Sequence, residues 1–449
     1  MDAHAPNSTS EGSFVTLEKL VSLCKRRGFI FQSAEIYGGV TGLYDTGPLG
    51  TLMKQNIRTL WKQSLNHLEQ EVVYIDGALI GPEAMWKASG HISNFHDPMV
   101  DCMVCKHRYR ADDINLEKPC PHCGNKQWTA VRDFNLMFTT QVGANTGQST
   151  TAYLRPETAQ VVFVNFKNVM TSSRAKIPFG IAQIGKAFRN EITPKQFLFR
   201  MREFEQMELE WFCKPSESNH FYNFWMLQRM MFMHAIGITK ERLRLHAHSE
   251  GELSHYSRGT SDIEYHFSFG WKELEGIAHR GDYDLTQHME HSGKDLKVYD
   301  EETKESYTPH VVECSVGVDR LFLTLLFDAY HEDTVEGETR TVLRLHPAIA
   351  PITVAILPLT KKQHDLAHPL YKKLKLANYS VEYDVSGSIG KRYRRQDEIG
   401  TPVCITVDFD TPADNTVTLR HRDSTQQERI SIDDITKRLN DLLKISFLG

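Results

Sequence analysis

The amino-acid sequence predicts an α+β protein: an antiparallel sheet flanked by helices, a small cysteine-bearing insertion and a C-terminal α/β unit. Three observations support this fold class. Polar and apolar residues alternate strictly between Ala187 and Trp211, two cysteine pairs interrupt the N-terminal half, and strand-like and helix-like segments alternate after residue 351. Since 449 residues are many for one hydrophobic core, we expect two or three domains.

Composition and charge are those of an ordinary globular protein, with 40% hydrophobic and 24% charged residues and a formal net charge of -5. A surface for nucleic acid must therefore be a local patch. No apolar run approaches the ~20 residues that span a bilayer, and residues 1–14 lack the apolar core of a signal peptide. We expect a cytoplasmic protein without membrane contact and with a disordered tail over residues 1–14.

The first elements of the chain are expected to be helices. Apolar residues keep helical spacing over Leu17–Arg27 and again over Leu52–Leu68, and a β-rich run follows at Val72–Ile80. The glycine-rich passage Tyr37–Gly50 has neither the dinucleotide nor the P-loop spacing. A structural turn is therefore favoured there over a phosphate cradle.

Four of the eight cysteines form two CxxC pairs with fourteen residues between them: Cys102, Cys105, Cys120 and Cys123. This spacing indicates a zinc-ribbon-like insertion over about residues 101–130 that holds one structural Zn²⁺. Four reduced thiols are the alternative. His107 and His122 are interpreted as bystanders, because four thiolates complete a tetrahedron. The remaining cysteines are scattered, which argues against a secreted disulfide framework.

The residues from Ala187 to Trp211 predict two strands joined by a polar loop at residues 194–196. On the first strand Arg189 and Glu191 share a face. The return strand has a polar and an apolar face: Phe204, Gln206, Glu208 and Glu210, and opposite them Met207, Leu209 and Trp211. Because an arginine fork binds phosphate, an aromatic ring stacks a base and carboxylates hold ammonium, the polar face suits a ligand. A solvated face with cross-strand ion pairs is the alternative.

Two more segments place charged residues near helix starts. In YLRPETAQVVFVNF a turn leads into an apolar helix, with Pro156 at the first helical position and Glu157 in the first turn. Val311–Phe327 passes from strand to helix at Gly317, so Arg320 projects from the first turn. A cation there opposes the helix dipole and indicates a bound anion, whereas pairing with a nearby carboxylate such as Asp319 is the alternative.

Beyond His346–Pro351 the chain alternates between strands and helices, which predicts an α/β unit over residues 347–449 after a larger unit over residues 15–346. The expected strands are ITVAILPL, YSVEYD, VCITVDF and NTVTLRHR, and the expected helices are Lys361–Leu376 and Ile432–Leu443. The run GKRYRRQ gathers four cations around Tyr393. Such a run is either a solvated face or a surface for phosphates and unstacked bases.

Five strings in the chain resemble motifs of one family. FRNEITPKQFLFRMREFEQMELE resembles the second signature motif of class II aminoacyl-tRNA synthetases, in the form used by the dimeric glycyl-tRNA synthetases. RPETAQ, ELEGIAHR, VVECSVGVDR and SIGKRYRRQDEIGTP are similar to further motifs of that family, in the same order. The resemblance runs from about Leu17 to the C-terminus. It implies a class II synthetase catalytic domain with its antiparallel sheet and a C-terminal anticodon-binding domain.

The resemblance also implies which residues bind the nucleotide. Arg189 and Arg320 match the catalytic arginines at the α- and γ-phosphates of ATP. Glu273 matches a position near ATP that is a plausible Mg²⁺ contact. Phe204 matches the ring that stacks on adenine. The other implied ATP-binding residues are Asn190, Glu191, Phe199, Arg200, Met201, Arg202, Glu203, Leu274, Gly317, Val318 and Asp319.

By the same matches, Glu157, Glu208 and Glu313 are expected to converge on the ammonium group of glycine, with Arg110 and Arg280 near the substrate. The other implied substrate-binding residues are Phe204, Glu205, Gln206, Met207, Cys314, Ser315, Val316 and Gly317. The chain departs from the family pattern at His279, Cys314 and Val316. These departures leave the expected chemistry intact and change the local hydrogen bonding and the size of the pocket.

The resemblance implies a homodimeric ligase that forms glycyl-adenylate from glycine and ATP and then charges tRNA(Gly). Two rival functions are a class II synthetase for another small amino acid and a catalytically dead paralogue that only binds nucleic acid. The collinear RPETAQ and ELEGIA strings disfavour the first. Such paralogues lose the ATP arginines, whereas Arg189 and Arg320 are present here.

Overall fold

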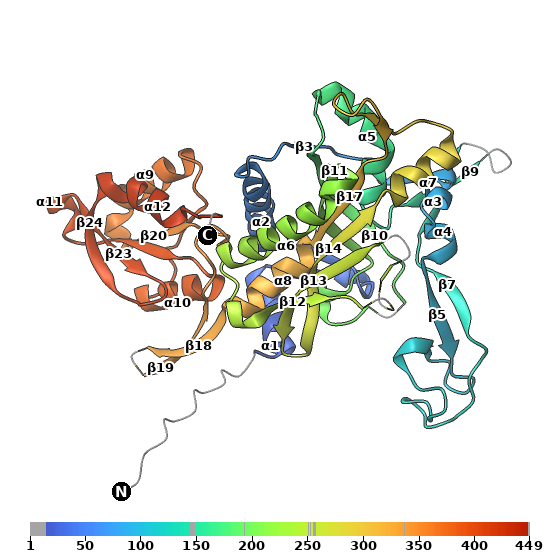
Figure 1. The fold of residues 1–449 in the computed structure, drawn as a ribbon. Coiled ribbons are helices and arrows are strands. Elements are labelled where there is room, and N and C mark those ends of the chain that lie inside the picture. Colours follow the sequence, from blue (N-terminus) through green and yellow to red (C-terminus); the bar gives the residue numbers. More distant parts are fainter. Residues whose placement is uncertain are drawn as a thin grey trace, which may run out of the picture.

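A computed structural model describes residues 15–143, 149–192, 194–249, 251, 253–254, 257–335 and 337–447. The tail predicted over residues 1–14 lies outside the described residues. Figure 1 shows a central body of sheet and helices, a slender arm at lower right and a smaller unit at left that contains the C-terminal residues. In the described part of the chain no helix combines the length and apolarity needed to cross a bilayer.

The N-terminal elements follow the predicted pattern. Helix α1 (Leu17–Arg27) has the predicted bounds and is capped by Thr16, whose side chain accepts from the backbone of Lys19. The glycine-rich passage forms turns and the short strand β2 (Tyr44–Thr46), which pairs with β1 (Ile30–Gln32). Helix α2 (Pro48–Asn66) starts four residues earlier than predicted because Pro48 occupies its first turn.

The central sheet has seven strands in the order β12-β13-β14-β17-β11-β10-β3. The strands from β12 to β10 pair antiparallel with one another, and only the edge strand β3 pairs parallel with its neighbour β10. In chain order the strands are β3 (Val72–Tyr74), β10 (Phe179–Phe188), β11 (Glu203–Cys213), β12 (Leu243–Ala247), β13 (Gly259–Phe267), β14 (Gly270–Gly281) and β17 (His310–Gly317). The expectation of an antiparallel sheet flanked by helices is confirmed.

The two faces of this sheet differ. One face packs against α1, α2, α6 (Ser218–Ala235) and α8 (Val318–Ala329) to form the main core, to which β11 contributes Met207, Leu209 and Trp211. The other face is covered at one end by α5 (Ala159–Ser173) and α7 (Tyr283–Ser292) over a smaller core. The polar side chains of β11 and β17 lie on this second face, so it can carry a site.

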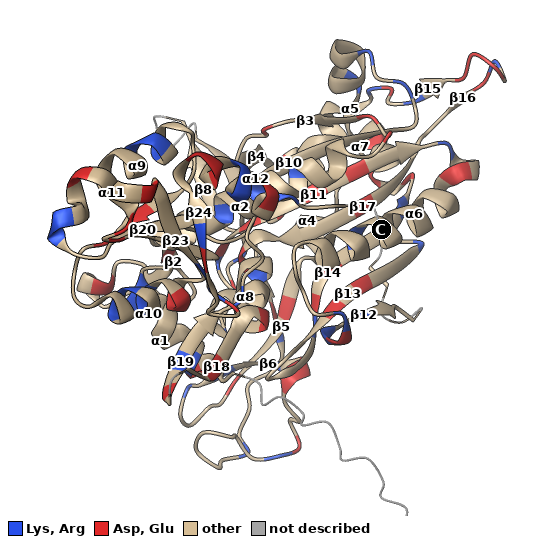
Figure 2. Ribbon diagram, turned by 90° about the vertical axis from the view of Figure 1, so that its left-hand side faces the viewer, with Lys and Arg blue, Asp and Glu red and all other residues tan. Residues whose placement is uncertain are grey.

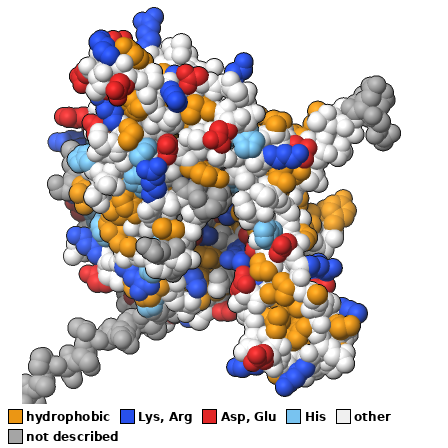
Figure 3. Space-filling model, turned by 45° about the vertical axis from the view of Figure 1, so that its right-hand side comes forward, with side chains coloured by type: hydrophobic (Ala, Val, Ile, Leu, Met, Phe, Trp, Pro, Cys, Tyr) orange, Lys and Arg blue, Asp and Glu red, His pale blue; other side chains and the backbone are white. Residues whose placement is uncertain are grey.

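The arm in Figure 1 is built on the three-stranded sheet of β5 (His96–Asp101), β6 (Arg108–Arg110) and β7 (Arg132–Asn135). Two short helices precede it, α3 (Glu83–Ala88) and α4 (His91–Asn94). A second small sheet joins β4 (Ile80–Pro82), β9 (Thr150–Leu154) and β8 (Thr139–Val142). Figure 3 shows the arm as a separate lobe with hydrophobic side chains on its visible face, and Met103 and Val104 are each about half exposed.

The C-terminal unit is a five-stranded mixed sheet in the order β21-β20-β22-β23-β24 with its own hydrophobic core. Its elements are β20 (Val354–Pro358), α9 (His364–Leu376), β21 (Val381–Tyr383), α10 (Ile389–Ile399), β22 (Val403–Val407), α11 (Thr411–Asp414), β23 (Thr416–His421), β24 (Gln427–Ser431) and α12 (Ile435–Leu443). The sequence did not predict α10 or β24. Ile349, Ile399 and Phe447 join the main core, so the two cores meet.

Two hairpins complete the described chain. One is β15 (Val298–Tyr299) with β16 (Ser306–Tyr307), and the other is β18 (Tyr330–Val335) with β19 (Glu338–Leu343). The second hairpin follows α8 directly and contacts the C-terminal unit, because Arg340 pairs with Asp397 of α10 at 3.1 Å. This ion pair is almost completely buried and connects the two units.

Candidate active site

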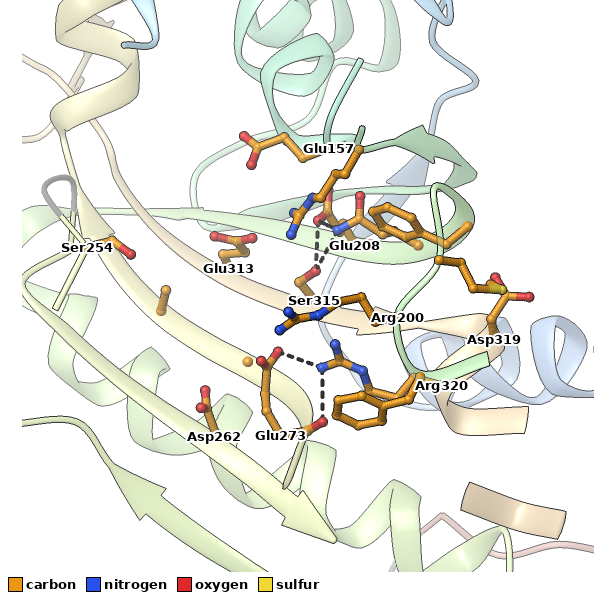
Figure 4. A pocket seen from close by; sticks show the side chains of 18 of the residues that line it. Glu157, Arg200, Glu208, Ser254, Asp262, Glu273, Glu313, Ser315, Asp319 and Arg320 are labelled. Carbon is orange, nitrogen blue, oxygen red and sulfur yellow. Dashed lines mark hydrogen bonds and ion pairs between the residues drawn. The ribbon is translucent and has the colours of Figure 1, made fainter. Parts of the chain in front are cut away.

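A cavity of about 450 Å³ opens on the polar face of the central sheet. Strands β11, β13, β14 and β17 form its floor, and the residues that follow β10 and the start of α8 form its walls. Figure 4 shows Glu157, Glu208 and Glu313 at one end and Glu273 with Arg320 at the other. The cavity therefore has a carboxylate end and an arginine end.

The cavity brings together fifteen of the residues singled out in the sequence: Glu157, Arg189, Glu191, Phe199, Arg200, Met201, Phe204, Gln206, Glu208, Glu273, Glu313, Ser315, Gly317, Asp319 and Arg320. It does not bring the rest to its surface: Arg110, Asn190, Arg202, Glu203, Glu205, Met207, Leu274, Arg280, Cys314, Val316 and Val318. Met207, Leu274, Cys314, Val316 and Val318 belong to the main core on the opposite face. The pleat of the strands explains this division, because successive side chains point to opposite faces.

Glu208 lies at the centre of the carboxylate end and is 1% exposed. Its carboxylate accepts from the Thr158 hydroxyl, from Gln206 Nε2 at 2.8 Å and from the Ser315 hydroxyl at 2.7 Å. Burial and the neighbouring Glu313 and Glu157 raise its pKa to about 7. The solvated-face alternative for this strand is therefore wrong, because Glu208 is enclosed by protein.

Glu313 lies beside Glu208 on strand β17. Burial raises its pKa although the guanidinium of Arg280 opposes the shift with a 2.6 Å ion pair. Arg280 also binds Asp284 through two nitrogens at 2.7 and 2.9 Å. Asp284 thus offsets the charge of Arg280, and the carboxylate end keeps an excess of negative charge.

Glu157 is the third carboxylate and is held by two side chains. Gln160 Nε2 donates to one oxygen at 3.1 Å, and His91 Nε2 lies 3.3 Å from the other. Burial alone would raise the pKa of Glu157, but His91 and Arg280 hold it well below its ordinary value. Glu157 is therefore an anion in this environment.

Glu210 continues the polar face of β11 below the cavity and is fully buried. Neither of its carboxylate oxygens has a hydrogen-bond partner among the described residues. Burial, with Glu313 opposite it in the sheet, raises its pKa well above the ordinary value. This burial favours the protonated form of Glu210, which limits the charge gathered under the cavity.

Arg189 lies near the turn that carries Glu157, with its guanidinium carbon 5.2 Å from the centre of the Phe95 ring and 5.3 Å from that of the Phe204 ring. Its Nε donates to the carbonyl of Pro156 at 3.1 Å. The sequence placed Arg189 and Glu191 within the first strand, but β10 ends at Phe188. Both residues follow the strand, where their side chains can face the cavity although the regular pleat has ended.

Arg320 lies in the first turn of α8, as the sequence predicts. It donates to the carbonyl of Glu273 at 3.0 Å, lies 3.3 Å from the Glu273 carboxylate and stacks on Phe199. The alternative of a nearby carboxylate partner is therefore met by Glu273. Its example, Asp319, is wrong, because Asp319 binds the buried Lys54 and the backbone N–H of Glu205. Arg320 pairs with a residue of β14, and the sequence alone does not show that β14 lies beside the start of α8.

Arg155 fixes the turn that carries Glu157. It is 1% exposed and donates to the carbonyls of Lys186 and Gly77 at 2.7 and 2.9 Å. Its guanidinium lies against Gly185 of β10, where a Cβ atom would overlap Nη2. The predicted placement of Pro156 at the first helical position is wrong, because α5 begins at Ala159. The turn is fixed by Arg155 rather than by the helix.

Several cavity residues had no clear signal in the sequence. His248 and Asp262 line the cavity and lie 2.8 Å apart. The sequence predicts a helical stretch up to His248 and a β-rich one around Asp262, but His248 follows the strand β12. His91 and Phe95, which contact Glu157 and Arg189, come from a segment without helical or strand periodicity. In the sequence His91 is a single histidine after a glycine, a pattern that indicates no particular function.

The four cysteine sulfurs of the arm lie within 4.8 Å of one another. Cys102 Sγ is 3.6 Å from Cys123 Sγ, and Cys105 Sγ is 3.7 Å from Cys120 Sγ. A tetrahedral zinc with Zn–S bonds of ~2.3 Å needs sulfurs about 3.8 Å apart. The donor set and spacing fit Zn²⁺. A second group, Cys105 with His107 and His122, also lies within 4.8 Å, although the two histidine rings are stacked and exposed.

The basic run of the C-terminal unit lies on α10, whose ribbon in Figure 2 carries both blue (Lys, Arg) and red (Asp, Glu) positions. Arg392 is buried and donates to the carbonyls of Pro358, Leu359 and Asp384. Arg395 pairs with the Asp384 carboxylate at 2.5 Å. The ring of Tyr393 is covered by Arg420 and its hydroxyl bonds Thr406. Much of this cluster is therefore bound within the protein, while Lys391 is exposed.

Comparisons with known proteins agree with this arrangement. Residues 139–330 match the family model described as "tRNA synthetase class II core domain (G, H, P, S and T)", and residues 353–442 match the model described as "Anticodon binding domain". Proteins named "Glycine--tRNA ligase" from Caldanaerobacter subterraneus subsp. tengcongensis and Alkaliphilus oremlandii are 52% and 51% identical to the chain. Each covers 96% of this chain and 99% of the relative. The protein of that name from Treponema denticola is 50% identical over 96% of this chain and 98% of its own length.

Proposed function

The chain belongs to the glycine--tRNA ligases, a family of class II aminoacyl-tRNA synthetases, and from that membership we propose how its cavity performs the reaction. The enzyme joins glycine to tRNA with ATP. The glycine carboxylate attacks the α-phosphorus of ATP, the bond to the β-phosphate oxygen breaks, and pyrophosphate leaves. A hydroxyl at the 3′ end of the tRNA then attacks the carbonyl carbon of glycyl-adenylate, and AMP leaves.

The single observation that carries the proposed mode of binding is the separation of charge within one cavity. Glu157, Glu208 and Glu313 give the carboxylate end an excess of negative charge. An ammonium group is a cation of the right size to neutralise them. We therefore assign the amino group of glycine to this end, which directs its carboxylate towards the arginine end.

We assign the phosphates of ATP to Arg189 and Arg320, which lie on either side of the assigned glycine carboxylate, and the adenine to the ring of Phe204. These groups neutralise charge at phosphorus and align the reactants, which is most of what the reaction needs from protein. Carboxylate oxygens suit Mg²⁺, and Glu273 offers them. Asp262 lies close by, because burial and the charge of Glu273 raise the pKa of Asp262. When bound, Mg²⁺ supplies further positive charge to the phosphates.

The other assigned residues remain proposals. For ATP they are Asn190, Glu191, Phe199, Arg200, Met201, Arg202, Glu203, Leu274, Gly317, Val318 and Asp319. For glycine they are Arg110, Phe204, Glu205, Gln206, Met207, Arg280, Cys314, Ser315, Val316 and Gly317. Those that do not reach the cavity would act by supporting residues that do, as Arg280 supports Glu313.

Selection of glycine follows from crowding. One additional methyl group is worth only ~1–3 kcal/mol in apolar contact. Discrimination against alanine must therefore come from excluding its methyl group. Three carboxylates packed around one ammonium leave little room there, so the same side chains bind glycine and exclude larger amino acids.

We propose that the four cysteines of the arm hold one structural Zn²⁺, because four thiolates leave no open position for catalysis. The test is elemental analysis of purified protein together with titration of its thiols. About one zinc per chain, with the four thiols protected until a chelator is added, is the expected result. Metal-free protein with all four thiols reactive and unchanged activity would contradict it.

We further propose a homodimer of chains working in the cytoplasm, in which residues 15–346 form the catalytic domain, about residues 101–130 its insertion, and residues 347–449 the anticodon-binding domain. Ile36 and Tyr37 just upstream of α2 are 88% and 87% exposed. Exposed apolar side chains of this size favour a protein contact. Measurement of the molar mass in solution tests the dimer.

The function is tested by exchange of labelled pyrophosphate into ATP with each of the twenty amino acids in turn. We expect exchange with glycine alone, followed by transfer of glycine to tRNA(Gly). Preference for another amino acid would support a synthetase of different specificity. Absence of exchange with all of them, together with retained binding of RNA, would support a paralogue without catalysis.

A further inference from the structure

Residues 86–97, the root segment, connect the central body to the cysteine-bearing arm. Trp86 lies in helix α3 of the body, and His96 is the first residue of β5, the first strand of the arm. Between them the chain passes along the wall of the cavity. It contacts two residues that line the cavity, Glu157 and Arg189, although no residue of the root segment lines the cavity itself.

At the carboxylate end the contact is made by His91. Its Nε2 lies 3.3 Å from Glu157 Oε2, with only 12% and 14% of the two side chains exposed. Its Nδ1 lies 2.8 Å from the Ser89 hydroxyl, and its ring packs edge-on against Trp86. When the Ser89 hydroxyl donates to Nδ1, the neutral ring carries its hydrogen on Nε2, and this N–H faces Glu157.

A second contact is made by Phe95, whose ring centre lies 5.2 Å from the guanidinium carbon of Arg189. The backbone carbonyl of Phe95 accepts from Leu136, whose own carbonyl accepts from Asn190 next to Arg189. The root segment is thus connected to Glu157 by a side chain and to Arg189 by both a ring and the backbone.

On the outer side, the root segment continues into the arm that carries the cysteines. Asp97 is buried and lies 3.2 Å from Arg110 of β6, and β5 pairs with both β6 and β7. The first cysteine, Cys102, follows β5 immediately. A change in the fold of the arm therefore reaches His91 through about ten residues of chain that are paired or buried along much of their length.

We propose that His91 is a positioning residue that holds Glu157 as an anion facing the cavity and so couples amino-acid binding to the cysteine-bearing arm. This inference rests on the proposed function, in which Glu157 binds the ammonium of glycine. It adds a group that touches no substrate and acts through Glu157. It also gives the arm a route to the cavity that does not pass through Arg110, which does not line it.

The test compares steady-state pyrophosphate exchange by the zinc-loaded full chain and three variants. His91→Phe keeps the ring between Trp86 and Phe95 but loses the N–H, and Ser89→Ala removes the hydroxyl that orients the ring. His96→Asn is the matched control, because His96 lies on the same segment and pairs with the exposed Asp133 away from Glu157. Thermal unfolding of each variant reports on folding.

We expect His91→Phe to raise the KM for glycine about tenfold or more, with the KM for ATP changed less than about twofold, because a partner of a buried charge is lost. Ser89→Ala should raise the glycine KM by a smaller factor in the same direction, and His96→Asn should match the wild type. A normal glycine KM in folded His91→Phe, or in Ser89→Ala if His91→Phe does not fold, would overturn the proposal. Equal changes in both KM values would also overturn it.

Coupling to the arm is tested by combining His91→Phe with Cys105→Ser. If the arm acts through His91, the double variant should show a smaller rise in glycine KM than the product of the two single effects. A rise equal to that product would show that the arm and His91 act independently. Failure of the wild type to exchange pyrophosphate with glycine would count against the proposed function itself, whatever the variants do.

Discussion

Two clusters of charge dominate the molecule, and they use charge in opposite ways. In α10 the cations are bound by the protein: Arg392 by three carbonyls and Arg395 by Asp384. In the cavity the protein's own cations and donors do not fully compensate the carboxylates. The pKa values of Glu208 and Glu313 stay raised despite their partners. A charged run therefore indicates a ligand only where the folded chain does not already supply the partners.

The largest effect that this comparison predicts is on catalysis. Arg189→Ala or Arg320→Ala should lower kcat/KM for pyrophosphate exchange by about 10²–10³, or ~2.7–4 kcal/mol, as expected for loss of one preorganised donor at a transition state. Arg244→Ala is the matched control, because Arg244 pairs with Glu264 at 2.6 Å on the edge of the sheet and does not line the cavity. Normal turnover in either cavity variant would show that these arginines are only structural.

In α10 the corresponding change should act on stability instead. Arg392→Ala leaves three carbonyls at Pro358, Leu359 and Asp384 without their donor, which should cost roughly 2–3 kcal/mol of unfolding free energy. Denaturant unfolding measures the loss, and exchange of pyrophosphate with glycine should be unaffected at temperatures where the variant is folded. A variant as stable as the wild type but defective in tRNA binding would place Arg392 on the RNA surface.

The third prediction concerns pH. Because burial and its acidic neighbours raise the pKa of Glu208 to about 7, the carboxyl must lose its proton before it pairs with the ammonium of glycine. The KM for glycine should therefore rise about tenfold from pH 8 to pH 6, as expected for one proton that competes with the ligand. Glu208→Gln should bind glycine weakly and lose this dependence.

The unfolding free energy contributed by Glu208 changes with pH in the opposite direction to that of a carboxylate paired with a cation. The folded pKa of Glu208 lies above the ordinary value of 4.5, so the folded chain holds this proton more tightly than the unfolded chain. Its contribution to unfolding free energy is fully present below pH 4.5 and is lost as the pH rises to about 7. Addition of glycine should raise the melting temperature more at pH 8 than at pH 6. An equal gain at both values would contradict the assignment.

The smallest effect is expected at Lys391, the exposed cation of α10. Lys391→Ala should leave stability unchanged, weaken tRNA binding a few-fold and make the salt dependence of binding shallower by about one unit of slope. Titration of tRNA binding at several salt concentrations measures this. An unchanged slope would show that even this part of α10 is only a solvated surface.

The sequence could predict what local pattern determines. Helix α1 has its predicted bounds, β17 passes into α8 at Gly317, and β11 sends Met207, Leu209 and Trp211 into the core. Each follows from the spacing of apolar residues along one stretch of chain. The family motifs added the residues around the cavity, of which fifteen line it.

The sequence could not predict partners that come from distant elements. The pairing of Arg320 with Glu273 and the carbonyls around Arg392 depend on how separate strands and loops come together. His91 was missed for the same reason, because a single histidine outside any periodic segment gives no signal until Glu157 lies beside it. Tertiary contacts decide the role of a charged residue more than its neighbours in sequence do.

The contact between Arg155 and Gly185 also restricts how the gene can vary. Every amino acid reached from a glycine codon by one nucleotide change carries a Cβ atom, and at position 185 that atom would overlap the guanidinium of Arg155. The backbone conformation there is ordinary, so the restriction comes from space alone. Displacement of Arg155 would release the carbonyls of Lys186 and Gly77 and the turn that carries Glu157. Natural missense variants at this codon should therefore be rare among functional alleles, even though glycine 185 touches no substrate.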